Sequence, residues 1–203
     1  MIQIRILSPA DLPLIEAHLL RLAPEDRRLR FGFPLKDDAV RAHCRALPWP
    51  HALLFGHVQA GVLLGLGMLA WDAGVARADW RRDGELAVTV DRAARRQGIG
   101  AALTKVVVLA ARNRWLRRLH IHYLTENLPM QALARTLHPV VTVEAGESEA
   151  SLELAPPTQM SMAQEWLTEI GGWSDAMLDL FRLKPRPAPA EGAPAPAAAR
   201  ARA

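Results

Sequence analysis

The chain has 203 residues, half of them hydrophobic and 23% charged, so it can bury the core of one ordinary domain and is not intrinsically disordered. Its formal net charge of +4 favours anionic ligands but does not distinguish phosphate, nucleic acid or a lipid surface. A single cysteine, Cys44, excludes an intramolecular disulfide and a cysteine-rich metal site, and we expect no metal.

The first residues do not resemble a signal peptide. Asp11 and Glu16 interrupt the unbroken apolar run that such a peptide requires. The single Cys44, which we expect to be a buried structural thiol, leaves no intramolecular disulfide, and this agrees with a reducing compartment. The expected location is therefore cytoplasmic.

The first 50 residues predict a strand followed by two helices. Residues 2–7 alternate and include three isoleucines, as a strand does, and Ser8 and Pro9 then suit the start of a helix. Apolar residues follow at helical spacing: Leu12, Ile15, Leu19 and Leu22. Residues 24–34 form an arginine-rich loop or short helix, and a second helix is expected from residue 37 to about residue 47.

Residues 52–71 form a long apolar stretch that is almost able to span a bilayer, which needs about 20 apolar residues. However, His57, Gln59 and Gly61 lie at its centre, and its glycines would weaken a helix. Two strands joined by a turn at residues 59–61 account for the pattern better than a membrane span does.

The next part of the chain predicts a strand, a helix, a strand, a short helix and a hairpin. After an irregular polar stretch with Trp80 and Asp83, the elements are a central strand at 85–90, a helix at 98–113, a strand at 119–124, a short helix from Asn127 to near His138, and a hairpin of 140–144 and 149–154 around Gly146. The apolar face of the helix at 98–113 is formed by Ile99, Leu103, Val106, Val107 and Ala110.

The composition changes after residue 155. Two short amphipathic helices are expected at 160–170 and 173–181, and proline and alanine dominate from Lys184 onward, which cannot build a core. The expected parts are one domain at 1–155, a helical extension at 156–183 and a disordered tail at 184–203. The two helices have enough apolar surface to need a partner, and packing on the core is preferred over covering a cleft or forming a homodimer.

The segment with the clearest chemical meaning follows the strand at 85–90. Arg95 and Arg96 precede Gly98 and Gly100, which open the next helix. Glycines let a ligand approach the backbone, and the unpaired N–H groups and dipole of a helix start favour phosphate. No G-x-x-x-x-G-K-[ST] is present, which excludes a P-loop, and without G-x-G-x-x-G a Rossmann domain loses its main support.

The hexapeptide Arg95-Arg96-Gln97-Gly98-Ile99-Gly100 resembles the acyl-CoA loop of the GCN5-related N-acetyltransferases (GNAT), [RQ]-x-x-G-x-[GA] after the fourth strand. The order of predicted elements over residues 1 to about 155 is also similar to that family. The resemblance implies an α/β fold with a mixed, mostly antiparallel central sheet flanked by helices and splayed where acyl-CoA inserts. It also implies a bacterial-type enzyme that transfers acetyl directly from acetyl-CoA to an amine and releases coenzyme A.

In that family, loop amides hold the pyrophosphate of coenzyme A, and the end of the preceding strand pairs with the pantetheine arm. Carried over to this sequence, the cofactor-binding residues are Val88, Thr89, Val90, Arg95, Arg96, Gln97, Gly98, Ile99, Gly100, Ala101 and Asn127. A strand amide near Val88 would polarise the thioester carbonyl.

Glu85, ten residues before Arg95, matches the spacing of the strand-borne glutamate that some members use as general base. A carboxylate there would accept the proton of the amine, directly or through water. The alternative is a surface or salt-bridged glutamate at the start of a strand.

The sequence departs from the family at the general acid. Many members have N-x-x-A-x-x-L-Y after the next strand, and its tyrosine protonates the leaving thiolate. Here Asn127, Met130 and Leu133 are in register, but Ala134 replaces the tyrosine, and His138-Pro139 replaces the usual Gly-Phe. The general acid is therefore unassigned, and a coenzyme A thiolate can leave without one.

The strand at 119–124 contains the only tyrosine of the chain and two histidines. Alternation places Tyr123 on a face that packs in the core. His120 and His122 share the other face, either as hydrogen-bonded structural residues, which we prefer, or beside the acceptor. Trp71 and Trp80 are core candidates that would otherwise wall an acceptor pocket.

We therefore expect an N-acetyltransferase for a primary amine, either a protein lysine or a small molecule. Two alternatives stay open: a catalytically silent acyl-CoA-binding regulatory module on the same fold, and a basic nucleic-acid binder that uses residues 92–118 but lacks a recognisable module. No membrane partner is expected. Residues 26–33, similar to a segment of some bacterial protein-lysine acetyltransferases, form a solvated basic loop or contact the acceptor or the cofactor's 3′-phosphate.

Overall fold

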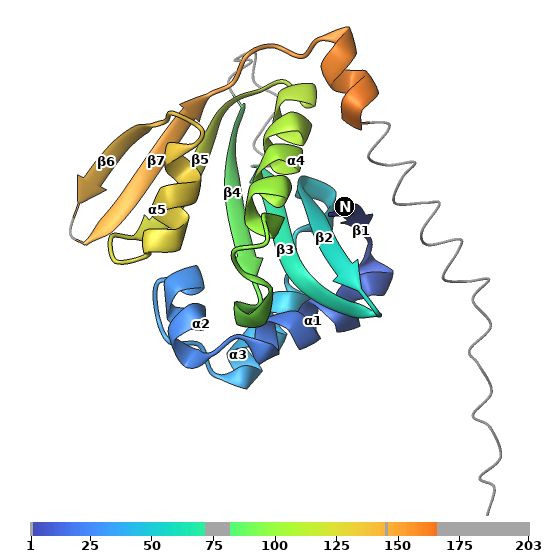
Figure 1. The fold of residues 1–203 in the computed structure, drawn as a ribbon, viewed down its shortest axis with the longest axis vertical. Helices are drawn as coiled ribbons and strands as arrows, with labels where there is room; N and C mark the ends of the chain where they lie inside the picture. The colour runs from blue at the N-terminus through green and yellow to red at the C-terminus, as the bar shows by residue number, and fades with distance from the viewer. Residues whose placement is uncertain (1, 72–81, 145, 166–203) are drawn as a thin grey trace, which may run out of the picture.

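One seven-stranded sheet runs through the computed structural model, which describes residues 2–71, 82–144 and 146–165 (Figure 1). Its strand order is β1-β2-β3-β4-β5-β7-β6, and all neighbours are antiparallel except β4 and β5, which are parallel. The strands are β1 (Arg5–Leu7), β2 (Ala52–Gln59), β3 (Val62–Trp71), β4 (Arg82–Val90), β5 (Leu116–Leu124), β6 (Val140–Glu144) and β7 (Glu147–Glu153). The predicted mixed, mostly antiparallel sheet is confirmed.

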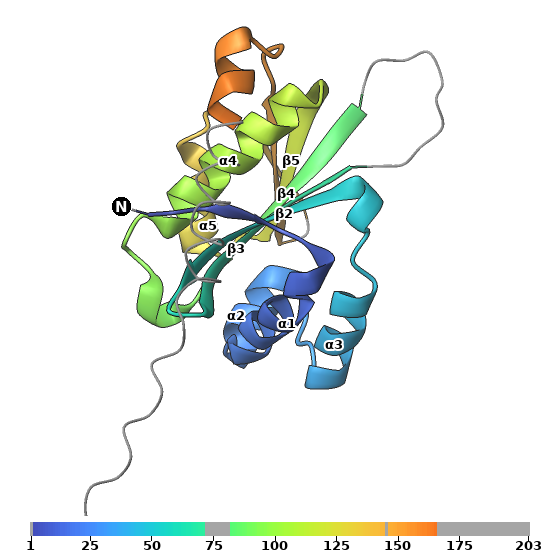
Figure 2. The same cartoon turned by 90° about the vertical axis from the view of Figure 1, so that its right-hand side faces the viewer.

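Helices cover both faces of this sheet (Figure 2). They are α1 (Leu12–Arg21), α2 (Pro24–Phe31), α3 (Asp37–Arg45), α4 (Ile99–Asn113), α5 (Leu128–Arg135) and the 3-10 helices η1 (Pro9–Asp11), η2 (Trp49–His51) and η3 (Arg92–Ala94). The first three α-helices lie on one face, and α4 and α5 lie on the other. Residues 159–165 are also helical, at the start of the predicted extension, and the remainder of that extension and the tail lie outside the described residues.

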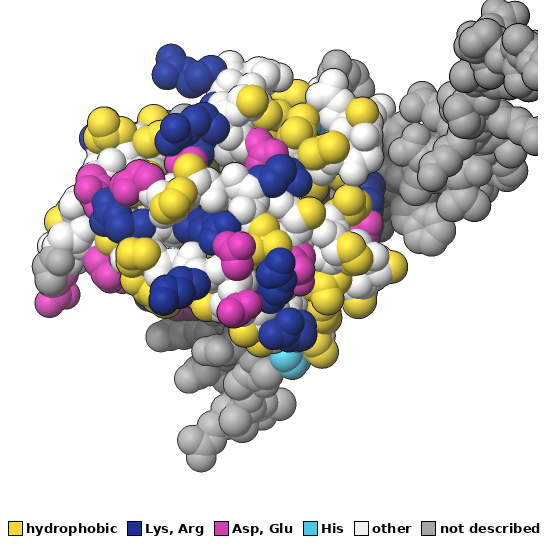
Figure 3. All heavy atoms as spheres, turned by 90° about the horizontal axis from the view of Figure 1, so that it is seen from below, with side chains coloured by type: hydrophobic (Ala, Val, Ile, Leu, Met, Phe, Trp, Pro, Cys, Tyr) yellow, Lys and Arg dark blue, Asp and Glu magenta, His cyan; other side chains and the backbone are white. Residues whose placement is uncertain are grey.

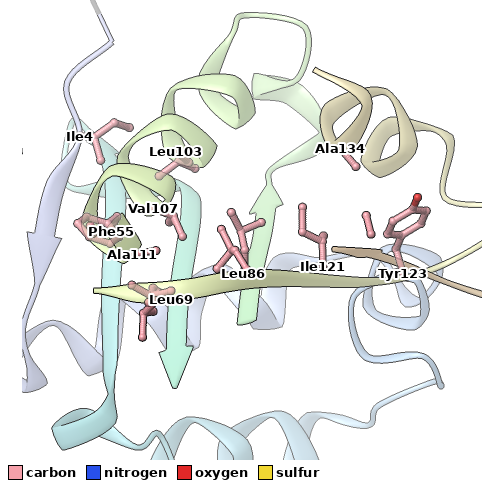
Figure 4. Close-up of a cluster of buried hydrophobic side chains, with 14 of the residues drawn as sticks. Ile4, Phe55, Leu69, Leu86, Leu103, Val107, Ala111, Ile121, Tyr123 and Ala134 are labelled. Carbon is pink, nitrogen blue, oxygen red and sulfur yellow. The ribbon is translucent and has the colours of Figure 1, made fainter. Parts of the chain in front are cut away.

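Helix α4 packs across the sheet and forms one of two apolar clusters (Figure 4). Its buried residues Ile99, Leu103 and Val107 face the sheet, where Leu69 is one of their neighbours. The approach is closest at Gly65 of β3, where a Cβ atom would lie 2.6 Å from Ile99 Cγ2 and 3.0 Å from Leu103 Cδ1. Packing therefore requires glycine at this position, and the contact sets where α4 begins relative to the sheet.

The second cluster lies on the opposite face, where α1 and α3 pack on β2 and β3. Ile15 of α1 and Val40 and Cys44 of α3 are fully buried in it. Burial raises the pKa of the Cys44 thiol to about 11, so the thiol stays protonated at neutral pH. The expectation of a buried structural thiol is confirmed.

The hairpin predicted at 52–71 is confirmed. Strands β2 and β3 pair along their lengths, and Ala60 and Gly61 form the turn with φ of 49° and 77°. The alternative of a membrane span at 52–71 is wrong, because the segment is two strands. Among the described residues, no helix is long and apolar enough to cross a membrane.

Strand β1 is shorter than predicted, since it begins at Arg5 and leaves out residues 2–4. Arg5 pairs with Gly56, so Ile4 would next meet His57. The register between β2 and β3 shifts between His57 and Val58, so β2 is irregular next to the position where its pairing with β1 stops.

Strands β4 and β5 begin earlier than predicted, at Arg82 and Leu116. Asp83 consequently lies in β4, pairing with Arg118, and not in an irregular polar stretch. Periodicity missed these strand ends because their charged residues break the apolar pattern, while the pairing of the two ends with each other supplies the backbone hydrogen bonds.

His120 joins three strands where β4 and β5 last pair. Its Nδ1 lies 2.6 Å from Glu149 Oε1 of β7, and its Nε2 lies 3.1 Å from Asp83 Oδ2 of β4. Burial lowers the pKa of His120, but the hydrogen bonds and negative charges of Asp83 and Glu149 outweigh this, so its pKa lies above the ordinary value of 6.5. The predicted hydrogen-bonded structural role of His120 is confirmed.

Replacing His120 by glutamine should make stability less dependent on pH. A histidine whose pKa is raised by folding stabilises the native state fully below its unfolded pKa, near 6.5, and this contribution disappears as the pH rises through the raised value. The difference in free energy of unfolding between the native protein and His120→Gln should therefore shrink with rising pH. Urea titrations between about pH 6 and pH 9 measure it, and a difference that stays constant would contradict the assignment.

Candidate active site

Strands β4 and β5 separate in the middle of the sheet. Their pairing ends at Glu85 and His120, although β4 continues to Val90 and β5 to Leu124. Both strands therefore present backbone N–H and C=O groups to the space between them. Such groups need a partner, which water or a ligand must supply.

The backbone of Val88 points into this gap. Alternate residues of a strand direct their backbone groups to opposite sides, and the N–H of Asp91 donates to Leu64 O on the β3 side at 2.8 Å. The N–H and C=O of Val88 consequently point to the β5 side, where pairing has ended. Val90 also faces that side, but its carbonyl accepts a hydrogen bond from Arg95 Nε at 3.1 Å.

A cavity of about 930 Å³ occupies the gap and is bounded by β4, the start of α4, the end of β5, α5 and α2. The structure brings these predicted site residues together around it: Glu85, Val88, Thr89, Val90, Arg95, Arg96, Gly98, Ile99, Gly100, Ala101 and Asn127. Gln97 is the exception, because its side chain points elsewhere and donates to Ala93 O at 3.3 Å.

Helix α4 begins at the glycine-rich segment, as the sequence predicts. Gly98 is its N-cap residue, with a left-handed φ of 86°. At Gly100 a Cβ atom would meet nothing closer than 3.7 Å, so packing does not require glycine there. The missing side chain instead leaves room beside the unpaired N–H groups of the helix start, and this arrangement fits the diphosphate of acetyl-CoA.

The two arginines of the loop differ in what they are free to bind. Arg95 Nη2 pairs with the buried Asp26 of α2 at 2.9 Å and thereby holds the loop against that helix. Its charge is already neutralised. Arg96 is exposed and forms no ion pair with the residues described by the structure, so it is the loop arginine left for an anionic ligand.

The Thr89 side chain is not available to a ligand. Its Oγ1 lies 2.8 Å from Nε2 of His18, whose Nδ1 lies 2.9 Å from Leu63 O and 3.1 Å from Asp91 Oδ1. His18 is fully buried in α1 and fixes the end of β4. The sequence analysis did not single out His18, although its helical spacing from Ile15 and Leu19 placed it on the apolar face of α1 and was the available signal.

Glu85 and Arg30 share the cavity with opposite charges. Glu85 is exposed and forms no ion pair or side-chain hydrogen bond with any residue that the structure describes. Arg30 of α2 is half-buried, and burial lowers the pKa of its guanidinium, while the negative charge of Glu85 opposes that shift. The alternative of a salt-bridged Glu85 is therefore not supported among the described residues.

Helix α5 closes the cavity through Asn127 and stands opposite Tyr123. Asn127 Oδ1 accepts from the N–H of Met130 at 3.1 Å, as a helix start requires, and its Nδ2 donates to Leu29 O of α2 at 3.3 Å. Tyr123 packs in the core, as predicted, but it also lines the cavity. Figure 4 shows it below Ala134, the position without the expected tyrosine.

The Tyr123 hydroxyl is open to this cavity. It forms no hydrogen bond with the described residues, while no buried side-chain oxygen or nitrogen among them lacks a partner. The oxygen is therefore not sealed in the core. The alternation of residues correctly predicted which face of β5 carries Tyr123. It did not predict that this face also lines a cavity where β4 and β5 separate.

Other candidate residues fall into two groups. Trp71 packs against the core and does not line the cavity, and Trp80 lies outside the described residues. Residues 26–33 are largely helix α2 and not a solvated loop, and Asp26, Arg30 and Phe31 line the cavity. His122 lines it as well, stacked at 6.2 Å on His120.

Comparisons with known structures agree with this fold. The structure is similar to the GNAT domain of S. lividans PAT, at 19% identity and a TM-score of 0.62, covering 74% of this chain and 89% of that one. It is also similar to yncA from Salmonella typhimurium, solved with its cofactor acetyl-CoA (19% identity, TM-score 0.53, covering 78% and 99%). A third similar structure is the ribosomal-protein-S18-alanine N-acetyltransferase from Escherichia coli (18% identity, TM-score 0.56, covering 78% and 97%).

Comparison with curated protein sequences finds no match. The family model of the acetyltransferase (GNAT) family, however, matches residues 19–138, more than half of the chain. That span contains the separated strands, the glycine-rich helix start and the cavity between them. The chain therefore belongs to the acetyltransferase (GNAT) family of enzymes, which use acetyl-CoA as the acetyl donor.

Proposed function

We propose that the enzyme moves the acetyl group of acetyl-CoA directly to a primary amine, either of a small molecule or of a protein lysine. The observation that carries this proposal is that one cavity joins the glycine-rich start of α4 to the free carboxylate of Glu85. A donor held at the helix start and an amine beside Glu85 would meet where β4 and β5 separate. Direct transfer then needs no acyl-enzyme.

The amine must lose a proton before it can attack. A lysine-like amine with a pKa near 10.4 is neutral in only about one molecule in 2,500 at pH 7, which costs about 4.6 kcal/mol. Glu85 would accept this proton, directly or through water. Its exposed position, without an ion-pair partner among the described residues, leaves the carboxylate free to do so.

Bound acetyl-CoA supplies the acetyl group and a thiolate leaving group. The N–H of Val88, which points into the gap between the strands, would donate to the thioester oxygen as negative charge develops. Tyr123, opposite Ala134, would give its hydroxyl proton to the departing sulfur. The three groups come from β4 and β5, on either side of the gap.

The relatives support the chemistry but not one acceptor. One similar structure is named for an alanine of a ribosomal protein, and the others name no acceptor. The silent-module alternative would retain binding without turnover. Nucleic-acid binding has little support on the face shown in Figure 3, where Lys and Arg side chains alternate with Asp and Glu and do not form one basic patch.

Gly100→Glu should abolish acetyl-CoA binding while leaving the protein folded. The position tolerates a side chain, and a glutamate suits the first turn of a helix, but its bulk and charge would oppose a diphosphate. Calorimetric titration with acetyl-CoA measures this, with a loss of affinity of more than about tenfold expected. Ala93→Glu, an equal charge change at an exposed position outside the cavity, is the control. Equal losses of acetyl-CoA affinity in both variants would contradict the assignment of the cofactor site to this loop.

Glu85→Gln should lower the rate of acetyl transfer by about 10²- to 10⁴-fold, the usual contribution of a general base. Acetyl-CoA affinity should not change, because the residue lies away from the helix start. The residual rate should rise with pH toward the pKa of the amine, since only the neutral acceptor reacts. The measurement is the release of coenzyme A thiol with a panel of amines. An unchanged rate would mean that Glu85 is a surface residue and not the general base.

Tyr123→Phe should lower turnover by up to about 10²-fold without lowering stability. The phenylalanine ring preserves the packing against the core, and only the hydroxyl is removed. The loss should be moderate because a thiol is already a good leaving group. Turnover and the thermal midpoint are compared in the same preparations. Full activity in this variant would mean that the thiolate leaves without help from Tyr123.

A further inference from the structure

The arginines of α2 differ in how they are paired. Arg27 donates to Leu20 O, Leu22 O and Leu35 O and forms an ion pair with Asp37. Arg28 forms ion pairs with Glu25 and Glu126. Arg30 has neither kind of partner among the described residues, although its guanidinium carbon lies 5.0 Å from the centre of the Phe31 ring and its charge helps to lower the pKa of His43. One guanidinium is therefore left free while its neighbours are all engaged.

This free cation lines the cavity and is half-buried. Burial lowers the pKa of Arg30, so the surroundings disfavour an isolated charge there. A guanidinium without a carboxylate partner is a strong, planar donor for two oxygens of a ligand. Such a residue in a cavity is better explained by a bound anion than by a contribution to stability.

The diphosphate of acetyl-CoA is not that anion. It would lie at the start of α4, where Arg96 and the helix N–H groups are available. Arg30 instead lines the cavity together with Glu85, because α2 packs against β4, and the negative charge of Glu85 raises the pKa of Arg30 against the effect of burial. Val90 lies five positions after Glu85 in β4, about 16 Å along the strand. The Arg30 end of the cavity is therefore the acceptor end.

Glu85 and Arg30 together present a negative and a positive group that do not pair with each other. An acceptor with an ammonium and a carboxylate would satisfy both. We infer that the acceptor is a small amino carboxylic acid whose amine lies at Glu85 and whose carboxylate binds Arg30. This inference rests on the proposed function, because it assigns the substrate class of the same site.

The reaction balances without any other reactant. The acceptor ammonium loses one proton to Glu85, which passes it to solvent, and the neutral amine then forms the new C–N bond while the C–S bond of the thioester breaks. The nitrogen loses a second proton to solvent as the amide forms, so that one proton is released overall once the thiolate has been protonated. The thiolate takes a proton from Tyr123, which regains one from solvent. The product, an N-acetylamino acid, loses the positive charge that attracted it to Glu85, and this favours its release.

The test compares matched acceptors. Amino acids and their carboxamides are offered with acetyl-CoA to the native protein and to Arg30→Gln, Arg30→Lys and Arg28→Gln, and coenzyme A release is followed. Binding of the same compounds to the protein saturated with coenzyme A is measured in parallel. The native protein should prefer the acid over its amide by about 10- to 100-fold in kcat/KM.

Arg30→Gln should abolish this preference, and Arg30→Lys should retain part of it. Arg28→Gln, which removes an equal charge outside the cavity, should leave it unchanged. Two results would overturn the inference and leave the proposed function standing. One is that the native protein acetylates amino acids and their carboxamides equally well, and the other is that it acetylates amines without a carboxylate, such as a lysine within a peptide, as well as amino acids. If no amine is acetylated and no amino acid binds, both are overturned.

Discussion

The separation of β4 from β5 is the constraint on which the rest of this site depends. Parallel pairing stops at Glu85 and His120, so the inner edges of two central strands have no strand partner from there on. Unpaired backbone groups inside a protein are costly unless water or a ligand satisfies them. The sheet is thus built to accept an extended ligand with amide groups of its own, and the cavity is a consequence of the backbone before any side chain is considered.

A gap in a sheet stays open only if each strand end is held from outside. His18 of α1 holds the end of β4 through Thr89. The loop after β4 is held by Arg95, which pairs with Asp26 of α2. Asn127, at the start of α5, holds Leu29 of α2. Three helices therefore brace the cavity through buried or half-buried polar contacts, which are directional and rigid in a way that apolar packing is not.

The sequence predicted the elements with local chemistry. The glycine-rich start of α4, the hairpin turn at Ala60 and Gly61 and the exposed Glu85 all follow from short patterns that act on their own backbone. The comparisons establish the family, and the particular site residues stay a prediction that the cavity geometry supports.

What the sequence did not show was which distant residues are paired. His18 and Thr89 are 71 positions apart, and the local sequence around either residue does not predict the contact with the other. The sequence predicted Arg95 as a phosphate ligand, because its partner Asp26 lies in the distant helix α2 and the pairing was not visible from local sequence. Tyr123 was predicted only as a core residue, because alternation shows which face of a strand a residue lies on but does not show where two strands separate.

In the proposed function, the two faces of the sheet would keep the donor and the acceptor from competing for the same space. Val88 and Val90 pack on the α4 side with Tyr123. Alternation turns Glu85 to the opposite side, where α2 lies with Arg30. A donor on the α4 side and an acceptor on the α2 side can meet only through the gap between β4 and β5. In the proposed function, one break in strand pairing would therefore supply the binding edge for the donor and the passage to the acceptor.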